Sequence, residues 1–277
     1  MSNCSSCPSK SSCSKEKDTC GVVINPYNKI KNVIGVMSGK GGVGKSTVST
    51  VIARKLAKKG YKVGVLDADV TGPSIPRLLG LKNKKVESNG KYFIPVENNE
   101  GIKVISLNLL IDDENEPVIW RGPVIAGVIK QFWEEVLWGE IDYLVVDMPP
   151  GTGDVALTVM QTIPLSGIVM VSIPQDMVSM IVAKAINMAK KMDVNILGIV
   201  ENMSYVTCPD CDKKIYPFGE YDSKDFLEEM NTSILARLPM TRDISCLSKG
   251  EDIEENKEVD SIFNNMIDEI LKGMEMR

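Results

Sequence analysis

Short apolar runs alternate with amphipathic stretches along most of the chain. Each apolar run has the length of a strand, and the runs occupy residues 33–37, 62–66, 91–96, 102–107, 142–146, 166–172, 196–200 and 233–238. Apolar positions recur at helical spacing in residues 45–59, 124–137, 177–192 and 260–271. Strands that alternate with helices predict an α/β fold, a mostly parallel sheet with helices on both faces. Ligands of such sheets bind at the carboxyl ends of the strands.

The clearest candidate site is a glycine-rich segment between the first predicted strand and the first predicted helix. Residues 39–46 match the pattern G-x-x-x-x-G-K-[ST]. The glycines let backbone N–H groups point inward and bind phosphate at the start of a helix. Lys45 would reach the β- and γ-phosphates, and the Ser46 hydroxyl could bind Mg²⁺. The sequence therefore predicts an ATP-binding P-loop formed by Gly39, Lys40, Gly41, Gly42, Val43, Gly44, Lys45, Ser46 and Thr47.

Acidic residues follow two of the predicted strands at their carboxyl ends. Asp147 comes directly after residues 142–146, where a Walker-B carboxylate would hold Mg²⁺ through a water molecule. Residues 148–154 then predict a stiff loop suited to sensing a γ-phosphate. Asp67 and Asp69 end the second strand, and Asp69 is predicted to position the attacking water or the metal. Solvated or capping carboxylates at strand ends are the alternative interpretation.

Lys40 is a second lysine inside the loop, where an ordinary P-loop needs only the one before the Ser or Thr. A cation at this position cannot easily fold back onto phosphates that Lys45 already holds. It could instead contact the nucleotide of a partner subunit, as an arginine finger does in trans. We therefore expect a homodimer, with Lys40, Lys45, Asp69 and Asp147 as the catalytic set.

Seven cysteines and no histidine are present, so a soft-metal site would be built from thiolates. Cys208 and Cys211 form a C-x-x-C pair in a polar segment, a spacing that lets two thiolates hold one ion. Two subunits meeting at a two-fold axis would supply four thiolates, enough for Zn²⁺ or a [4Fe–4S] cluster. A redox dithiol or two structural thiols are the alternatives. Ligation is also expected of the N-terminal set, Cys4, Cys7, Cys13 and Cys20, whereas Cys246 is interpreted as incidental.

Composition and charge narrow the class of protein. The 277 residues are 43% hydrophobic and carry a net charge of −5, which argues against a general nucleic-acid binder. No apolar run approaches a membrane span of about 20 residues, and the start lacks a secretory h-region, so we expect a cytoplasmic protein. Three parts are predicted: a flexible Cys-rich tail (1–30), a P-loop ATPase domain (31–250) with a C-x-x-C insertion at 203–218, and a C-terminal helix packed on the domain (251–277).

Three segments together resemble a known family: the P-loop with its second lysine, residues 147–154, and the C-x-x-C pair after residues 201–205. The chain resembles the Mrp/ApbC-type iron–sulfur cluster carrier ATPases of the deviant Walker-A, MinD-like class, over about residues 30–250. The resemblance implies a homodimer that bridges a labile [4Fe–4S] cluster through Cys208 and Cys211 and delivers it to apoproteins. It also implies that ATP binding and hydrolysis, with Mg²⁺, are coupled to cluster loading or transfer.

The same resemblance assigns roles to single residues. Lys40 looks like the signature lysine, Asp69 like the switch I acid, and Asp147 opens switch II. Asn202 is placed like a residue that contacts adenine, with a strand-end turn former as the alternative. The N-terminal cysteines resemble the ferredoxin-like tail of the eukaryotic cytosolic members, although Cys4 lies only three residues from the start and Cys20 would have to be the fourth ligand.

Three rival functions follow from the same features. A spatial-positioning ATPase of the MinD or ParA kind would use the apolar stripe of the last helix as a membrane anchor. Acidic residues on the polar face of that helix, Asp260, Asp268 and Glu269, favour packing against the domain instead. The second rival is a zinc-stabilised ATPase with purely structural cysteines. The third, a nitrogenase-reductase-like electron donor, is disfavoured because its cluster ligands lie far apart in sequence.

Overall fold

The computed structural model describes residues 25–70, 72–111, 120, 122–176, 180–219, 223–242, 244 and 256–275. Cys208 and Cys211 lie within these ranges. The four N-terminal cysteines and Cys246 lie outside them, so their predicted roles stay predictions.

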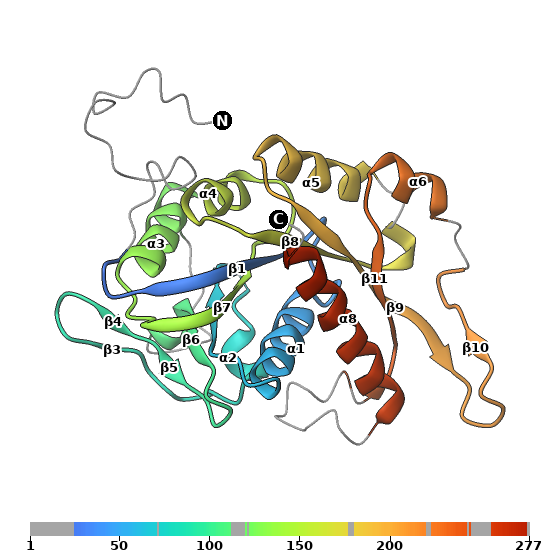
Figure 1. Ribbon diagram of the computed structural model, residues 1–277, viewed down its shortest axis with the longest axis horizontal. Coiled ribbons are helices and arrows are strands. Elements are labelled where there is room, and N and C mark those ends of the chain that lie inside the picture. Colours follow the sequence, from blue (N-terminus) through green and yellow to red (C-terminus); the bar gives the residue numbers. More distant parts are fainter. Residues whose placement is uncertain are drawn as a thin grey trace.

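A nine-stranded, mostly parallel sheet forms the centre of the described molecule (Figure 1). Its strands are β1 (Lys29–Ser38), β2 (Val63–Asp67), β5 (Val96–Glu97), β6 (Lys103–Ile105), β7 (Glu140–Asp147), β8 (Gly167–Ser172), β9 (Ile196–Thr207), β10 (Lys214–Ile215) and β11 (Ile234–Pro239). The order is β10-β9-β8-β1-β7-β2-β6-β5, and β11 also pairs with β9. Only the β9–β10 and β5–β6 pairs are antiparallel. The short strands β3 (Glu87–Ser88) and β4 (Phe93–Ile94) form a separate ladder.

Helices cover both faces of this sheet, as predicted. One face is covered by α1 (Lys45–Lys58), α2 (Ile75–Leu78) and α8 (Lys257–Glu275). The other is covered by α3 (Gly122–Glu134), α4 (Asp154–Thr162) and α5 (Met180–Lys191). The helix α6 (Lys224–Glu229) and the 3₁₀ turns η3 (Leu107–Leu109) and η4 (Pro174–Asp176) complete the described elements. The predicted α/β fold is confirmed.

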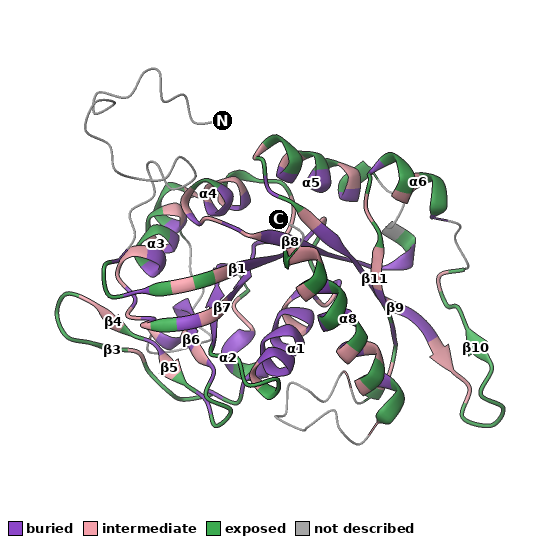
Figure 2. Ribbon diagram, in the orientation of Figure 1, coloured by how far each residue is buried: buried purple, intermediate pink, exposed green. Residues whose placement is uncertain are grey.

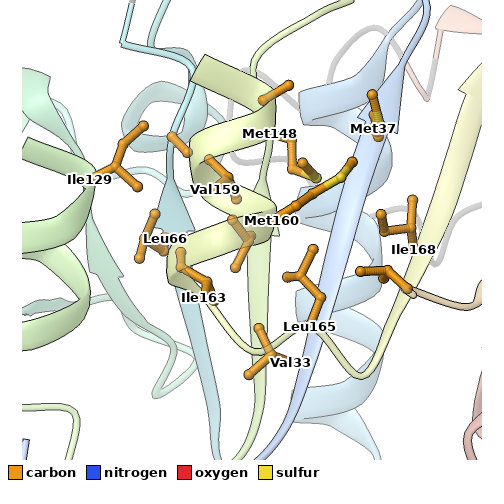
Figure 3. Close-up of a cluster of buried hydrophobic side chains, with 14 of the residues drawn as sticks. Val33, Met37, Leu66, Ile129, Met148, Val159, Met160, Ile163, Leu165 and Ile168 are labelled. Atoms are coloured by element: carbon orange, nitrogen blue, oxygen red, sulfur yellow. The ribbon is translucent and has the colours of Figure 1, made fainter. Parts of the chain in front are cut away.

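Alternation of side chains along β1 explains the two cores. Val33 and Met37 point into the core under α3, α4 and α5, whereas Ile34 and Val36 point into the core under α1 and α8. Figure 3 shows the first core, where Val159 and Met160 of α4, with Ile163 directly after it, lie over the strands. Strands that are buried on both faces give the continuous apolar runs seen in the sequence.

Two boundaries and one helix differ from the sequence expectations. The folded part begins before residue 31, because Asn25 and Asn28 donate side-chain hydrogen bonds to the carbonyls of Glu134 (3.0 Å) and Val136 (2.8 Å). The ninth strand continues to Thr207 rather than ending at residue 200, since β11 and then β10 pair with its second half. The helix α4 was not predicted, and it begins at the last residue of the predicted stiff loop.

The last helix packs on the domain along its apolar stripe. Phe263, Met266, Ile267 and Ile270 are fully buried in the core that α8 shares with α1. On the polar side, Lys55 of α1 pairs with Asp260, and Lys59 pairs with Asp268 at 2.8 Å. The apolar stripe of α8 is therefore part of the hydrophobic core. None of the described helices is long and apolar enough to cross a membrane.

Candidate functional site

The P-loop lies at the carboxyl end of β1 and leads into α1. Gly42 and Gly44 have φ angles of +80° and +87°, which L side chains rarely adopt. A Cβ atom added at Gly44 would lie 2.2 Å from Nδ2 of Asn202. That amide donates a 2.9 Å hydrogen bond to the carbonyl of Val43. The loop therefore needs glycine both for its backbone shape and for the close approach of β9.

Lys45, the first residue of α1, is buried between two carboxylates. Its Nζ lies 2.8 Å from Oδ2 of Asp147 and 3.2 Å from Oδ2 of Asp69. Burial opposes the charged form of the amine, but the charges of Asp147 and Asp69 outweigh it and raise the pKa of Lys45. The ammonium group is therefore charged, and both carboxylates hold it. The structure brings three of the four predicted catalytic residues together.

Asp147, the last residue of β7, is fully buried and accepts hydrogen bonds from two serine hydroxyls of α1. Ser46 Oγ lies 2.6 Å from its Oδ2, and Ser49 Oγ lies 2.6 Å from its Oδ1. Ser46 and Asp147 are thus adjacent, as a shared Mg²⁺ site requires. Ser49 was not among the predicted site residues, although its position four residues after Lys45 places it on the same helix face.

Asp67 ends β2, opposite Asp147 in the parallel register, and is also buried. Its carboxyl accepts hydrogen bonds from Ser106 Oγ (2.9 Å) and from the backbone N–H of Asp69 (3.2 Å). Burial, with the nearby charge of Asp147, raises the pKa of Asp67 to about 8. Asp67 is therefore mainly protonated at neutral pH, and it positions Asp69 through the backbone.

A cavity of about 530 Å³ opens above the P-loop. Its volume falls in the range of small-molecule sites, about 300–1,000 Å³. Residues at the end of β1, in the P-loop and at the start of α1 form its floor: Ser38, Gly41, Gly42, Gly44, Lys45, Ser46 and Thr47. The other lining residues are Asp69, Gly72, Ser74, Leu78, Pro150 and Met203. Because it lies at the carboxyl ends of β1, β2 and β7, it occupies the usual ligand position of a parallel sheet.

Lys40 and Asn202, both predicted to contact a nucleotide, lie outside the cluster around Lys45. Lys40 is exposed on the loop, and its predicted action on a partner's nucleotide stays a prediction. Asn202, predicted to contact adenine, is buried behind the loop with its amide on the Val43 carbonyl. The structure thus gives Asn202 a contact with the loop backbone that sequence analysis did not foresee. Its adenine contact stays a prediction.

Cys208 and Cys211 lie at the tip of the β9–β10 hairpin, which extends from the body of the molecule (Figure 1). The backbone N–H of Cys208 donates to the Lys213 carbonyl, and that of Asp212 donates to the Cys208 carbonyl, both at 3.0 Å. Hydrogen bonds from the backbone of Asp210, and from the side chain and backbone of Cys211, lower the pKa of the Cys208 thiol. Cys211 is exposed and Cys208 is half-buried, so both thiols can be reached from solvent.

The hairpin alone supplies two soft ligands. No group of three or more Cys, Asp or Glu side chains that could hold a metal ion occurs in the part of the chain that the structure describes. A tetrahedral site at this tip would therefore need ligands from another chain or from outside the described ranges.

The chain is similar to several known proteins. The iron–sulfur cluster carrier protein of Clostridium perfringens is 48% identical over 284 residues, covering 96% of this chain and 100% of that protein. A nucleotide-binding protein from Archaeoglobus fulgidus, solved in complex with ADP, is 43% identical with a TM-score of 0.73, covering 84% of this chain and 92% of the other. The cell division ATPase MinD of Pyrococcus furiosus, 23% identical with a TM-score of 0.62 over 87% of this chain and 98% of its own, shares the fold.

The family described as NUBPL iron-transfer P-loop NTPase matches residues 29–274, nearly all of the described chain. That range contains the P-loop, both acidic strand ends and the cysteine hairpin. The chain therefore belongs to the NUBPL iron-transfer P-loop NTPase family.

Proposed function

We propose that this protein is an ATP-dependent iron–sulfur cluster carrier, which holds a [4Fe–4S] cluster between two copies of the chain and transfers it to apoproteins in the cytoplasm. The observation that carries the proposal is the placement of two accessible thiols at the tip of a hairpin whose strand β9 also contacts the P-loop. The names of the relatives support a carrier role.

The nucleotide half of the proposal rests on the P-loop and its carboxylates. Mg²⁺ favours oxygen ligands, and the Ser46 hydroxyl with Asp147, through water, would hold it beside the phosphates, where it would neutralise developing charge. Lys45 would exchange its contacts with Asp147 and Asp69 for the β- and γ-phosphates. Asp69, freed from that ion pair, would orient the attacking water.

The cluster half rests on the cysteines. Two thiolates from each of two chains complete the four-sulfur set that a [4Fe–4S] cluster requires. The lowered pKa of Cys208 favours the thiolate form, which is the form that binds iron. The exposed position of Cys211 leaves a bridged cluster accessible to an acceptor protein.

Anaerobic reconstitution tests the cluster site. With iron and sulfide, the wild-type protein is expected to show a broad band near roughly 400 nm, and Mössbauer spectroscopy should identify [4Fe–4S]. The double variant Cys208→Ser with Cys211→Ser should lose transfer to an apo iron–sulfur protein while still binding Mg-ADP. Cys246→Ser is the matched control. Transfer that persists in the double variant, or bound zinc without the band, would refute the proposal and favour structural cysteines.

Mixing two inactive variants tests Lys40 in trans. Lys40→Ala should bind ATP but not hydrolyse it, whereas Lys45→Ala should lose binding. In a mixed dimer, the Lys45→Ala subunit would supply its intact Lys40 to the ATP of the other subunit, so the mixture should regain activity. A mixture as inactive as its parts would contradict action in trans. Sedimentation with liposomes and ATP separates the spatial-positioning rival, which requires binding to the membrane.

A further inference from the structure

Strand β9 connects the nucleotide site directly to the cysteine hairpin. In its middle, Asn202 holds the P-loop through the Val43 carbonyl, and Cys208 follows Thr207 at its end. Up to Glu201 the strand lies between β8 and β11. Beyond Tyr205 its described partners are β10 and the residues after β11, with the Met240 N–H donating to the Tyr205 carbonyl at 2.7 Å. One continuous strand therefore has a firmly paired half and a more weakly held half.

Met203 lies at the junction of these halves with its backbone in the left-handed region. Its φ angle is 56°, a conformation that is costly for a side chain of this size. The other described non-glycine residues with positive φ are all Asn or Asp, residue types that tolerate it: Asn83, Asp193, Asp212 and Asn231. On β11 the register shifts between Arg237 and Pro239, opposite Glu201 and Tyr205. Met203 is thus the centre of a bulge within the strand.

Contacts around the bulge hold this conformation. Ser204 Oγ lies within hydrogen-bonding distance of the Glu201 carbonyl (2.9 Å) and of Glu201 Oε1 (2.7 Å). Glu201 is buried and lies 3.5 Å from Nε of Arg237 on β11. Strain of this kind persists only where the surroundings impose it, and a change in those surroundings can release it.

The nucleotide cavity is such a surrounding, because Met203 forms part of its wall. We propose that Met203 is a hinge: a nucleotide in the cavity changes the backbone conformation at Met203 and thereby moves the hairpin that carries Cys208 and Cys211. Cys208 lies five positions after Met203, a span of about 17 Å at about 3.3 Å per residue. A rotation of about 10° at the hinge would therefore displace Cys208 by about 3 Å, more than an iron–sulfur bond length.

This inference rests on the proposed function only in assigning nucleotide to the cavity, and its test needs no cluster. Hydrogen exchange of the full chain, followed by mass spectrometry, would report the amides of the hairpin, among them those of Cys208 and Asp212. The probes are saturating Mg-ADP and Mg-AMPPNP, compared with nucleotide-free protein. We expect at least one of them to change hairpin exchange by about fivefold or more, the size that follows from releasing one strained residue.

Three variants of Met203 distinguish the effect of its strained backbone from the effect of its side chain in the cavity wall. Met203→Gly removes both the strain and the side chain, and the response should fall below about twofold. Met203→Leu keeps an apolar side chain on the same strained backbone, and the response should persist. Met203→Ala retains the strain but removes the contact with the cavity, so it too should lose the response, and it remains informative if the glycine variant folds poorly.

Calorimetric titration with Mg-ADP would show that each variant still binds nucleotide. An unchanged hairpin in the wild-type protein with both nucleotides would overturn the inference. So would a full response in Met203→Gly. Either result would leave the cluster site untouched, whereas cluster transfer that persists in the cysteine double variant would refute the cluster site and leave the hinge untouched. The two proposals can therefore fail independently.

Discussion

Replacing Ser49 by alanine would remove one oxygen atom from the buried side of the nucleotide site. The Ser49 hydroxyl is fully buried and lies 2.6 Å from Oδ1 of Asp147, with the Lys45 carbonyl at 3.1 Å as its alternative acceptor. In the variant, Oδ1 would lose its only described side-chain donor, while Oδ2 would keep Lys45 and Ser46. No water can easily replace the hydroxyl at a site with no exposed surface.

The size of the effect follows from the charge on the acceptor. A buried hydrogen bond to a charged group contributes about 1.5–3 kcal/mol, so Ser49→Ala should lower the free energy of unfolding by about 2 kcal/mol. For a chain of this length, that loss corresponds to a decrease of about 4–8 °C in Tm. Asp147 would also be oriented less firmly beside the Mg²⁺ position. If about 1.4 kcal/mol of the lost hydrogen-bond energy raises the activation free energy, kcat for ATP hydrolysis should fall about tenfold.

Thr50→Val is the matched control. It also removes one hydroxyl from α1, but Thr50 Oγ1 donates to the Ser46 carbonyl at 2.9 Å and does not contact Asp147. Thermal unfolding and steady-state ATP hydrolysis would be measured for both variants, with Ser49→Thr as a test of rescue. If Ser49→Ala and Thr50→Val lost the same stability and the same activity, the hydroxyl of Ser49 would not be orienting Asp147, and our account of the site would be wrong.

Three further predictions concern the site and the core. The pKa of Asp67 is about 8 in the folded state against an ordinary value of 3.8, so the folded state binds more protons than the unfolded state between these pH values. The free energy of unfolding should therefore fall as pH rises from about 4 to about 8. Urea unfolding of Asp67→Asn should lack the part of this pH dependence that Asp67 contributes. Gly44→Ala should abolish Mg-ADP binding in calorimetry because of the 2.2 Å contact with Asn202, whereas Gly41→Ala, with no atom within 4 Å, should retain most of it. Phe263→Ala should cost about 3–5 kcal/mol in chemical unfolding if α8 is part of the core, and exposed Ser261→Ala should cost almost nothing.

Features that depend on local chemistry could be predicted from the sequence. The P-loop was recognisable because its glycines, its lysine and its serine meet requirements set within eight residues. The convergence of Asp69 and Asp147 on Lys45 followed from a general property of parallel sheets, whose strands end at one edge. The packing of α8 followed from its amphipathic pattern.

Features that depend on distant partners required the tertiary structure. Asn202 meets Val43 across 159 positions of sequence, and no local pattern indicates that its amide contacts the backbone of the loop. The protonation of Asp67 arises from burial beside Asp147, and the role of Ser49 from the same carboxylate across 98 positions. The length of β9 was hidden because its polar second half is a strand only through pairing with β10 and β11. The sequence thus determined which chemical groups the protein has. Burial and strand pairing decided which of these groups act on one another, because burial and strand pairing depend on segments far apart in the chain.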